Sequence, residues 1–390
     1  MSKKLAILGG HKLFEPDIPF VRPYLPEFIN YTCDFENVYS SGMLTKGKYL
    51  NCYEKRVSDY QGGLDTVGVS SATLGITMTL QSLGIGAGDE VIVPSFTFCA
   101  TVHPIINVGA IPVFIDCRSD SLCIDDNKII SSITSRTKAI VAVHIFGVPA
   151  NVDRLREIAD RFGLILIYDA AHAFGTQHDN KPIGTFGDVS VFSTSPTKTL
   201  VTGEGGLVIT SHKEVADKIR LFREYGNPGN YNCTVCGTNG RLSEVASITG
   251  LMSLSCLDKQ LQIRKAVGDR YRHNLSSIMG IYLQCIPEDD FTTFKDMPIL
   301  INQEKFGLNR DLLDLVLKYE GIPTRKYFYP AVHAMDAYRA YNLLDLPITK
   351  RISNSILCLP IHAYLSNDDV DGICDVIREA QCNSNKIRNR

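Results

Sequence analysis

The hydrophobic residues of this 390-residue chain gather in short continuous runs separated by polar segments. Six runs rich in β-branched residues lie at Glu90–Val93, Pro112–Ile115, Ala139–Phe146, Leu164–Tyr168, Val189–Phe192 and Gly206–Ile209. Neighbouring positions within each run are apolar rather than alternating with polar ones. The runs therefore predict strands that are covered on both faces.

Helical spacing occurs between these runs. Val152, Leu155, Ile158 and Phe162 lie three or four residues apart, and the same spacing recurs within residues 215–222. Alternating strands and helices predict a mostly parallel central sheet of the α/β class. In such sheets ligands bind beyond the carboxyl ends of the strands.

After about Ser255 the pattern loosens into longer helices and short strands such as Met297–Ile301. We therefore expect a large α/β domain over residues 41–255 and a smaller α+β domain over residues 256–390. Residues 1–40 are expected to form an N-terminal arm that packs on the small domain. No low-complexity linker separates the two domains.

The composition narrows the classes of function. Hydrophobic residues make up 44% of the chain and charged residues 21%, as in ordinary soluble globular proteins. The formal net charge of −2 offers no basic surface to nucleic acid, so no such partner is expected. The apolar run near the first residue is about four residues long, too short for a signal peptide or a membrane span. We expect a cytoplasmic protein with no membrane partner.

Twelve cysteines are scattered from Cys33 to Cys382 without the spacing of a disulfide framework. A chain of this length can bury a core without disulfides, so we expect free thiols. Cys233 and Cys236 form the one suggestive pair, but no second pair lies at the spacing of a zinc site. No metal site is expected.

Two charged residues follow neighbouring predicted strands. Leu164–Tyr168 leads directly into Asp169, and Val189–Phe192 leads through Ser193 to Lys198. A carboxylate at the end of a buried strand is costly unless a cation meets it. Each charge alone is more typical of a helix cap or a solvated surface. Together they suit pyridoxal phosphate (PLP), which is carried on a lysine and needs an acidic partner for its ring nitrogen.

A turn suited to a phosphate group lies upstream. The short predicted strand Thr66–Val69 leads into Ser70–Thr73, and a helical pattern follows. Small hydroxylated residues at such a turn offer backbone N–H groups and a helix N-terminus to an anion. An ordinary helix cap explains the same residues equally well. The glycines within Gly84–Gly88 follow a helix rather than open one, so we reject a dinucleotide-binding motif.

Taken together, these motifs resemble the DegT/StrS-type sugar aminotransferases, a family of PLP-dependent enzymes of fold type I. The matching segments occur in the family's order and span nearly the whole chain: Gly42–Gly47, Ser70–Thr73, Gly88–Phe98, Tyr168–His172, Ser193–Lys198, Gly203–Gly206, Gly237–Arg241 and Leu359–His362. The resemblance implies an aminotransferase that converts a nucleotide-linked keto-sugar to an amino sugar. L-glutamate is the family's usual amino donor.

The resemblance also assigns roles to individual residues. Lys198 would carry the cofactor and act as the base, and Asp169 would keep the ring nitrogen protonated. The backbone of Ala72 and Thr73, with the hydroxyl of Ser193, would hold the phosphate. Ala72 stands where the family usually has glycine, which restricts the approach of the backbone.

Three further positions follow from the same resemblance. Phe98 would stack on the cofactor ring, although a core phenylalanine suits the sequence as well. His172 replaces the family's more usual glutamine and would contact the phenolic oxygen of the cofactor. Asn239 would reach the phosphate in the partner subunit, which implies a homodimer with shared active sites.

The substrate is the finest detail that the resemblance suggests. The segment Tyr168–Gly175 is similar to relatives that aminate C4 of nucleotide-linked 4-keto-6-deoxyhexoses. Tyr329 and His333 fall in a segment that lines the sugar pocket of relatives. Arg325 and the adjacent Lys326 are candidates for the nucleotide diphosphate, and an exposed basic pair is as good an explanation.

Other functions stay open at this stage. A sugar dehydratase of the same fold uses pyridoxamine phosphate and has histidine at the lysine position, so Lys198 argues against it. A non-enzymatic sensor is disfavoured by the presence of Asp169, Ser193 and Lys198 together. The sequence does not decide the nucleotide, the aminated carbon (C3 or C4), or a keto-cyclitol in place of the sugar.

Overall fold

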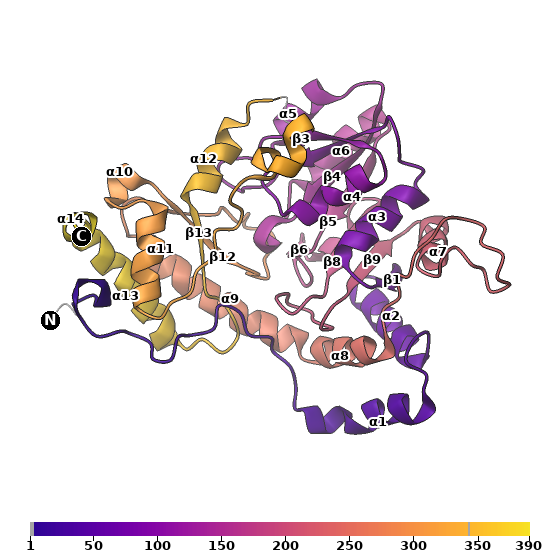
Figure 1. Cartoon of the computed structure of the whole chain (residues 1–390), viewed down its shortest axis with the longest axis horizontal. Coiled ribbons are helices and arrows are strands. Elements are labelled where there is room, and N and C mark those ends of the chain that lie inside the picture. Colours follow the sequence, from indigo (N-terminus) through magenta and orange to yellow (C-terminus); the bar gives the residue numbers. More distant parts are fainter. Residues whose placement is uncertain (1–3, 342–343) are drawn as a thin grey trace.

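A computed structural model describes residues 4–341 and 344–390. Its larger part is built on a seven-stranded sheet of order β1-β9-β8-β5-β4-β2-β3 (Figure 1). The strands are β1 (Asp65–Val69), β2 (Glu90–Pro94), β3 (Ile111–Ile115), β4 (Thr137–Val143), β5 (Ile165–Asp169), β8 (Val189–Ser193) and β9 (Gly206–Thr210). Only β9 pairs antiparallel with its neighbours in this sheet. The mostly parallel sheet predicted from the sequence is confirmed.

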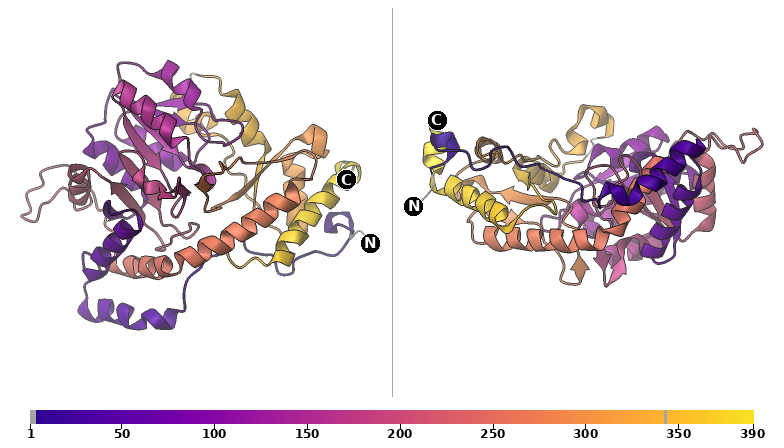
Figure 2. Two further views of the ribbon diagram at one scale, coloured as in Figure 1. Left: turned by 180° about the vertical axis from the view of Figure 1, so that it is seen from behind. Right: turned by 90° about the horizontal axis from the view of Figure 1, so that it is seen from below.

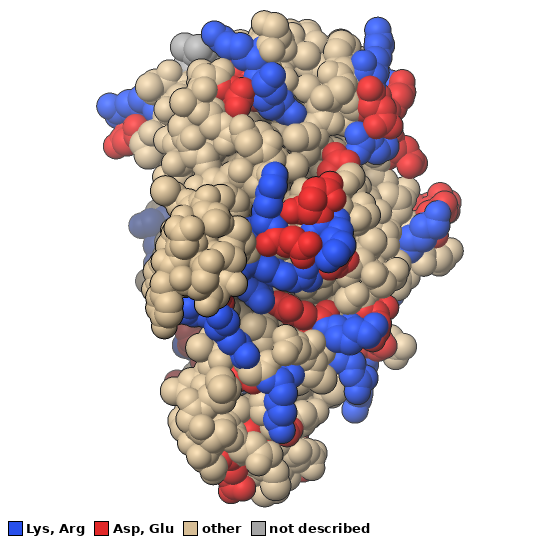
Figure 3. Space-filling view, turned by 90° about the vertical axis from the view of Figure 1, so that its right-hand side faces the viewer, with Lys and Arg blue, Asp and Glu red and all other residues tan. Residues whose placement is uncertain are grey.

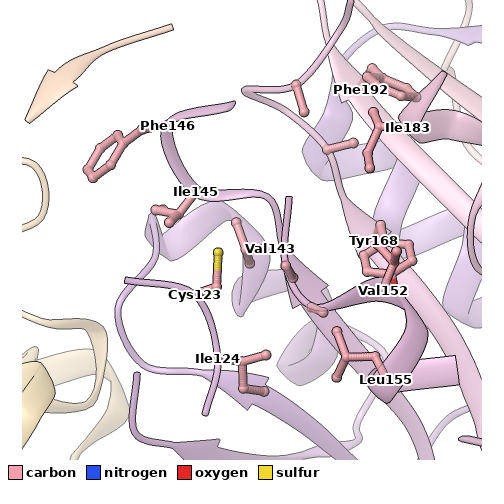
Figure 4. Close-up of a cluster of buried hydrophobic side chains, with 14 of the residues drawn as sticks. Cys123, Ile124, Val143, Ile145, Phe146, Val152, Leu155, Tyr168, Ile183 and Phe192 are labelled. Atoms are coloured by element: carbon pink, nitrogen blue, oxygen red, sulfur yellow. The ribbon is translucent and has the colours of Figure 1, made fainter. Parts of the chain in front are cut away.

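Helices cover both faces of this sheet. Ala139 and Val141 of β4 pack into the layer that contains α3, α4 and α7. Ile140, the residue between them, packs into the opposite layer with α2 and α6. Part of this second layer is shown in Figure 4, where side chains of α6 lie beside Tyr168 of β5. Successive strand residues point to opposite faces, so a continuous apolar run supplies both layers. The helices are α2 (Lys48–Tyr60), α3 (Ala72–Ser82), α4 (His103–Asn107), α5 (Asp126–Ile129), α6 (Val152–Phe162), α7 (Lys213–Phe222) and α8 (Glu244–Ser255).

One predicted strand is shorter than expected. The run Ala139–Phe146 forms a strand only as far as Val143. Phe146 has a left-handed backbone (φ 58°), and its N–H donates to Nδ1 of His172 at 3.1 Å. The last apolar residues therefore turn along the edge of the sheet toward the loop after β5.

The smaller part has its own core around a three-stranded antiparallel sheet of order β10-β12-β13. Helix α9 (Leu257–Leu275) leaves the larger part and runs along this sheet beside α13 (Figure 2). The predicted strand Met297–Ile301 is β12. The remaining elements are β10 (Ile281–Leu283), β13 (Ile356–Leu359), α10 (Gln303–Phe306), α11 (Arg310–Tyr319), α12 (Pro347–Ser355), α13 (Asn367–Cys382), α14 (Ser384–Arg388), and a separate small sheet of β6 (Gln177–His178), β7 (Lys181–Pro182) and β11 (Asp290–Phe291).

The N-terminal segment touches both parts of the molecule. Leu5 and Ile7 are buried in the core of the smaller part, and the N–H of Phe14 donates to the carbonyl of Glu320 at 3.0 Å. Helix α1 (Thr32–Ser41) lies instead beside α8, where Val38 packs with Ile248 (Figure 1). Residues 5–18 therefore pack against the core of the smaller part, whereas α1 packs against α8 of the larger part.

The surface charge, the helix lengths and the cysteines also bear on the expectations from the sequence. Acidic and basic side chains lie intermingled on the face shown in Figure 3. Within residues 4–341 and 344–390, no helix is long and apolar enough to span a bilayer. All twelve cysteines are free. Cys233 and Cys236 are exposed on the segment between α7 and α8, which projects from the body of the molecule (Figure 2).

Candidate active site

A cavity of about 310 Å³ opens at the carboxyl edge of the large sheet. Strands β5 and β8 are parallel neighbours, and they end at Asp169 and Ser193. Lys198 follows five residues later, on the loop that leads toward β9. All three residues line the cavity, together with Ala72, Thr73, Phe98 and His172. The structure thus brings seven of the predicted site residues together.

Asp169 is buried in the wall of this cavity. Its Oδ2 accepts a hydrogen bond from the hydroxyl of Thr101 at 2.6 Å, and its Oδ1 accepts one from the N–H of Ala171 at 3.0 Å. Burial raises the pKa of the carboxyl, and these two hydrogen bonds oppose the shift. Among the described residues, no cation lies within ion-pair distance of Asp169. The carboxylate therefore keeps acceptor capacity for a positively charged group in the cavity.

Lys198 presents its amine to the same cavity. No hydrogen bond or ion pair holds this amine within the described part of the chain. Burial lowers the pKa of Lys198 to about 7, and the nearby ammonium of Lys295 adds to the effect. A large share of the lysine is therefore unprotonated at neutral pH. The free amine is the form that attacks a carbonyl carbon.

His172 lines the cavity as a neutral ring. Burial lowers the pKa of this histidine well below its ordinary value. Because Nδ1 accepts a hydrogen bond from the N–H of Phe146, the neutral ring carries its proton on Nε2. The ring stacks on Phe328 with a centroid separation of 6.2 Å and an angle of 12°. His172 can therefore donate one hydrogen bond from a fixed orientation.

The start of α3 forms another side of the cavity. The side chain of Ser71 caps the helix by accepting a hydrogen bond from the N–H of Leu74 at 3.2 Å. The N–H groups of Ala72 and Thr73 precede the first hydrogen-bonded turn and are available to an anion. A Cβ at Gly206 would come within 2.5 Å of the backbone nitrogen of Ala72. Glycine at 206 therefore allows β9 to approach this turn.

Aromatic rings line the cavity where Phe328 of the smaller part meets the larger part. Phe98 is 54% exposed although it lines the cavity, and its ring centroid lies 5.9 Å from that of Phe328. Phe328 in turn stacks on Phe146 at 5.9 Å and 6°. An exposed aromatic face inside a cavity is available to stack on a planar ligand.

The other four predicted site residues do not line this cavity. Asn239 is exposed and forms a β-bridge with Glu224. Arg325 and Tyr329 line an adjoining groove of about 480 Å³. The ring of His333 is buried against the hydroxyl of Ser95 and faces a third hollow.

Residues 30–378 match the model of the DegT/DnrJ/EryC1/StrS aminotransferase family. The chain belongs to this family. The resemblance inferred from its motifs is confirmed, and the protein is an aminotransferase.

Individual members of the family match over most of their length. The dTDP-4-amino-4,6-dideoxy-D-glucose transaminase of Shigella dysenteriae is 34% identical to this chain. The match covers 92% of this chain and 96% of the transaminase. The structure of DesI, determined in the presence of its TDP-sugar product, is 31% identical with a TM-score of 0.92, and the match covers 99% and 98% of the two chains. The PLP form of Spr1654 from Streptococcus pneumoniae is 25% identical with a TM-score of 0.87. This match covers 95% of the present chain and 99% of the Spr1654 chain. These matches confirm the predicted fold.

The site also depends on residues that were not singled out from the sequence. Thr101 reaches Asp169 from the short helical turn after Phe98, and no local pattern marks a threonine for that contact. Lys295 and Phe328 come from the smaller part, far along the chain from the motifs at Asp169. Their position depends on how the two cores pack, which the sequence pattern does not encode.

Proposed function

We propose that the cavity binds PLP, with Lys198 as its point of attachment and Asp169 as the partner of its ring nitrogen. The observation that carries this proposal is the buried carboxylate of Asp169, which faces the cavity and has no cationic partner among the described residues. A protonated pyridine nitrogen would supply that cation. The unpaired amine of Lys198 lies in the same cavity, as a covalently bound aldehyde requires.

The remaining lining residues fit the other groups of the cofactor. The N-terminus of α3 at Ala72 and Thr73, with the hydroxyl of Ser193, would hold the phosphate. His172 would donate from Nε2 to the phenolic oxygen. The exposed face of Phe98 would stack on the ring.

Each of these residues would have a separate role in amino transfer. When bound, PLP supplies a ring that accepts the electrons released as the Cα–H bond of the amino donor breaks. Asp169 would hold a proton on the ring nitrogen and so favour this electron transfer. Lys198, with a pKa of about 7, would be placed to take and hold the proton of the donor Cα–H bond. A stacked Phe98 would restrict the tilt of the ring.

We further propose that the acceptor is a nucleotide-linked 4-keto-6-deoxyhexose and that the donor is L-glutamate. The names of the Shigella transaminase and of DesI with its TDP-sugar product support a nucleotide-sugar substrate. The groove beside the cavity shares Phe98 and Phe328 with it. Arg325 in this groove has no carboxylate partner within the described residues, so it would bind the diphosphate. Lys326 is already paired with Asp311 at 2.6 Å.

Turnover of a panel of nucleotide-linked keto-sugars with glutamate tests the substrate. We expect kcat/KM for a 4-keto-6-deoxyhexose nucleotide to exceed that for a 3-keto isomer or a keto-inositol by about 100-fold or more. Arg325→Gln should raise KM more than it lowers kcat, because the diphosphate is bound alike in the ground and transition states. Lys326→Gln is the matched control and should change KM less. Turnover confined to 3-keto sugars or keto-inositol would overturn the substrate assignment.

We also propose a cytoplasmic homodimer whose active sites are shared. Asn239 would contribute to the phosphate site of the partner subunit. Large apolar side chains around α1 are exposed in the single chain: Phe28 is 60% exposed, Ile29 73%, Tyr39 68% and Met43 56%. Such a group of exposed apolar side chains suits a surface that a second copy covers.

Mixing two inactive variants tests the shared site. Lys198→Ala and Asn239→Ala dimers, unfolded together and refolded, should regain activity, because one site of each hybrid dimer has all wild-type residues. Random reassociation predicts roughly one quarter of wild-type activity. Each variant refolded alone serves as the control. Full wild-type activity in a protein that sedimentation shows to be monomeric would refute the shared site.

A further inference from the structure

Lys295 is a second cation of the cavity, and the proposed reaction has not used it. Its side chain is 3% exposed and lines the same cavity as Lys198. The ammonium lies 2.9 Å from each carboxylate oxygen of Asp296. Lysine has three N–H donors, so one donor remains when both oxygens of Asp296 are served.

The ion pair of Lys295 and Asp296 is poorly suited to a structural role. It joins two consecutive residues and therefore connects no separate elements of the fold. Burying two charges also costs solvation, which their mutual attraction offsets only in part. Because Lys295 also lines the cavity, its ammonium can meet an anionic group of a ligand there.

The backbone around Lys295 is fixed from two sides. Arg264 of α9 is buried and donates to the carbonyls of Thr293 at 3.2 Å and Lys295 at 3.0 Å. The hydroxyl of Thr293 donates to the carbonyl of His172 at 3.0 Å. The segment is thus anchored both to α9 and to the loop after β5. Lys295 keeps its place relative to Asp169 and Lys198.

We propose that Lys295 binds the α-carboxylate of the amino-acid donor, with Asp296 positioning its ammonium. This inference rests on the proposed function. The α-carboxylate is attached to the same carbon as the amino group that reacts, so its cation must lie near the amine of Lys198. Of the surrounding charges, Lys295 acts most strongly on the pKa of Lys198. The diphosphate of a nucleotide sugar is separated from the reacting ketone by the sugar ring. The adjoining groove with Arg325 is the better match for it.

The two half-reactions separate this role from others. In the PLP form of the enzyme, Lys295→Met should raise the glutamate concentration that half-saturates conversion to the pyridoxamine form by about 10- to 100-fold. The reaction of the pyridoxamine form with the keto-sugar nucleotide should change by less than about threefold. Lys295→Arg keeps a cation and should recover a large part of the affinity for glutamate. The dissociation constant of glutarate, which has the carboxylates but no amino group, should rise in parallel with Lys295→Met when measured by calorimetry.

The outcomes distinguish this inference from the proposed function. If wild-type protein is not converted by glutamate or any other amino acid, the proposed function fails. If wild-type protein is converted and Lys295→Met shows the same dependence on glutamate and glutarate, the inference alone is wrong. Equal impairment of both half-reactions in a folded variant also overturns it. Should Lys295→Met not fold, Lys295→Met/Asp296→Asn removes both members of the ion pair and is measured in its place.

Discussion

Replacing Lys198 with alanine is expected to lower kcat by at least about four orders of magnitude, or roughly 5 kcal/mol of transition-state stabilisation. The amine lies unpaired in the cavity with a pKa of about 7, so it can serve both as the attachment point and as the base. No other residue described at the cavity combines these properties, because Lys295 is held by Asp296. Steady-state turnover with glutamate and a keto-sugar nucleotide measures the loss.

Spectroscopy and peptide mapping support the same test. Wild-type protein with PLP should absorb in the near-visible, and reduction with borohydride should leave the cofactor on the peptide that contains Lys198. Lys213→Ala is a suitable control, because that side chain is 76% exposed on α7 and should leave turnover unchanged. Recovery of the reduced cofactor on a different lysine would contradict the assignment.

Asp169→Asn is expected to lower kcat by at least about 100-fold. The amide is similar in size to the carboxylate and can still accept from Thr101, so the fold should be kept. It carries no negative charge and would leave the ring nitrogen largely unprotonated. The ring would then accept electrons poorly when the Cα–H bond breaks. Single-turnover conversion by glutamate measures this step directly.

An exposed carboxylate provides the comparison for Asp169. Asp336→Asn removes a charge from a side chain that is 86% exposed and should leave the rate within about twofold of wild type. Thr101→Val removes one hydrogen bond to Asp169 and keeps the carboxylate, so its effect should be intermediate. Turnover of Asp169→Asn close to wild type would mean that another acid holds the ring nitrogen.

The central sheet and the positions of Asp169 and Lys198 at its edge could be predicted because the sequence patterns that indicate them are local. Continuous apolar runs mark strands that are buried on both faces, and the residue after each run lies at the carboxyl edge. Asp169 and Lys198 follow two such runs, and β5 and β8 pair as parallel neighbours. The helical spacing within residues 152–162 likewise predicted a helix, which is α6.

The missing parts of the site depend on long-range packing. Lys295 precedes an ordinary apolar strand, and contacts of this segment with Arg264 of α9 and with His172 hold it at the cavity. Beyond the early end of β4, Phe146 donates a hydrogen bond to His172, a residue in a different loop. None of these contacts has a periodic signal in the sequence, because each joins segments that are distant along the chain and are brought together only by the fold.

The two-part construction of the cavity has an evolutionary consequence. Asp169 and Ser193 end neighbouring strands of the large sheet and Lys198 lies on the loop after Ser193, whereas Arg325 and Tyr329 lie on a segment of the smaller part. Substitutions in the second group can alter which sugar or nucleotide enters without displacing the carboxylate, hydroxyl or amine of the first. Descendants of one ancestral aminotransferase can therefore acquire new acceptors by gradual change at the groove, while selection keeps the chemistry at the sheet intact.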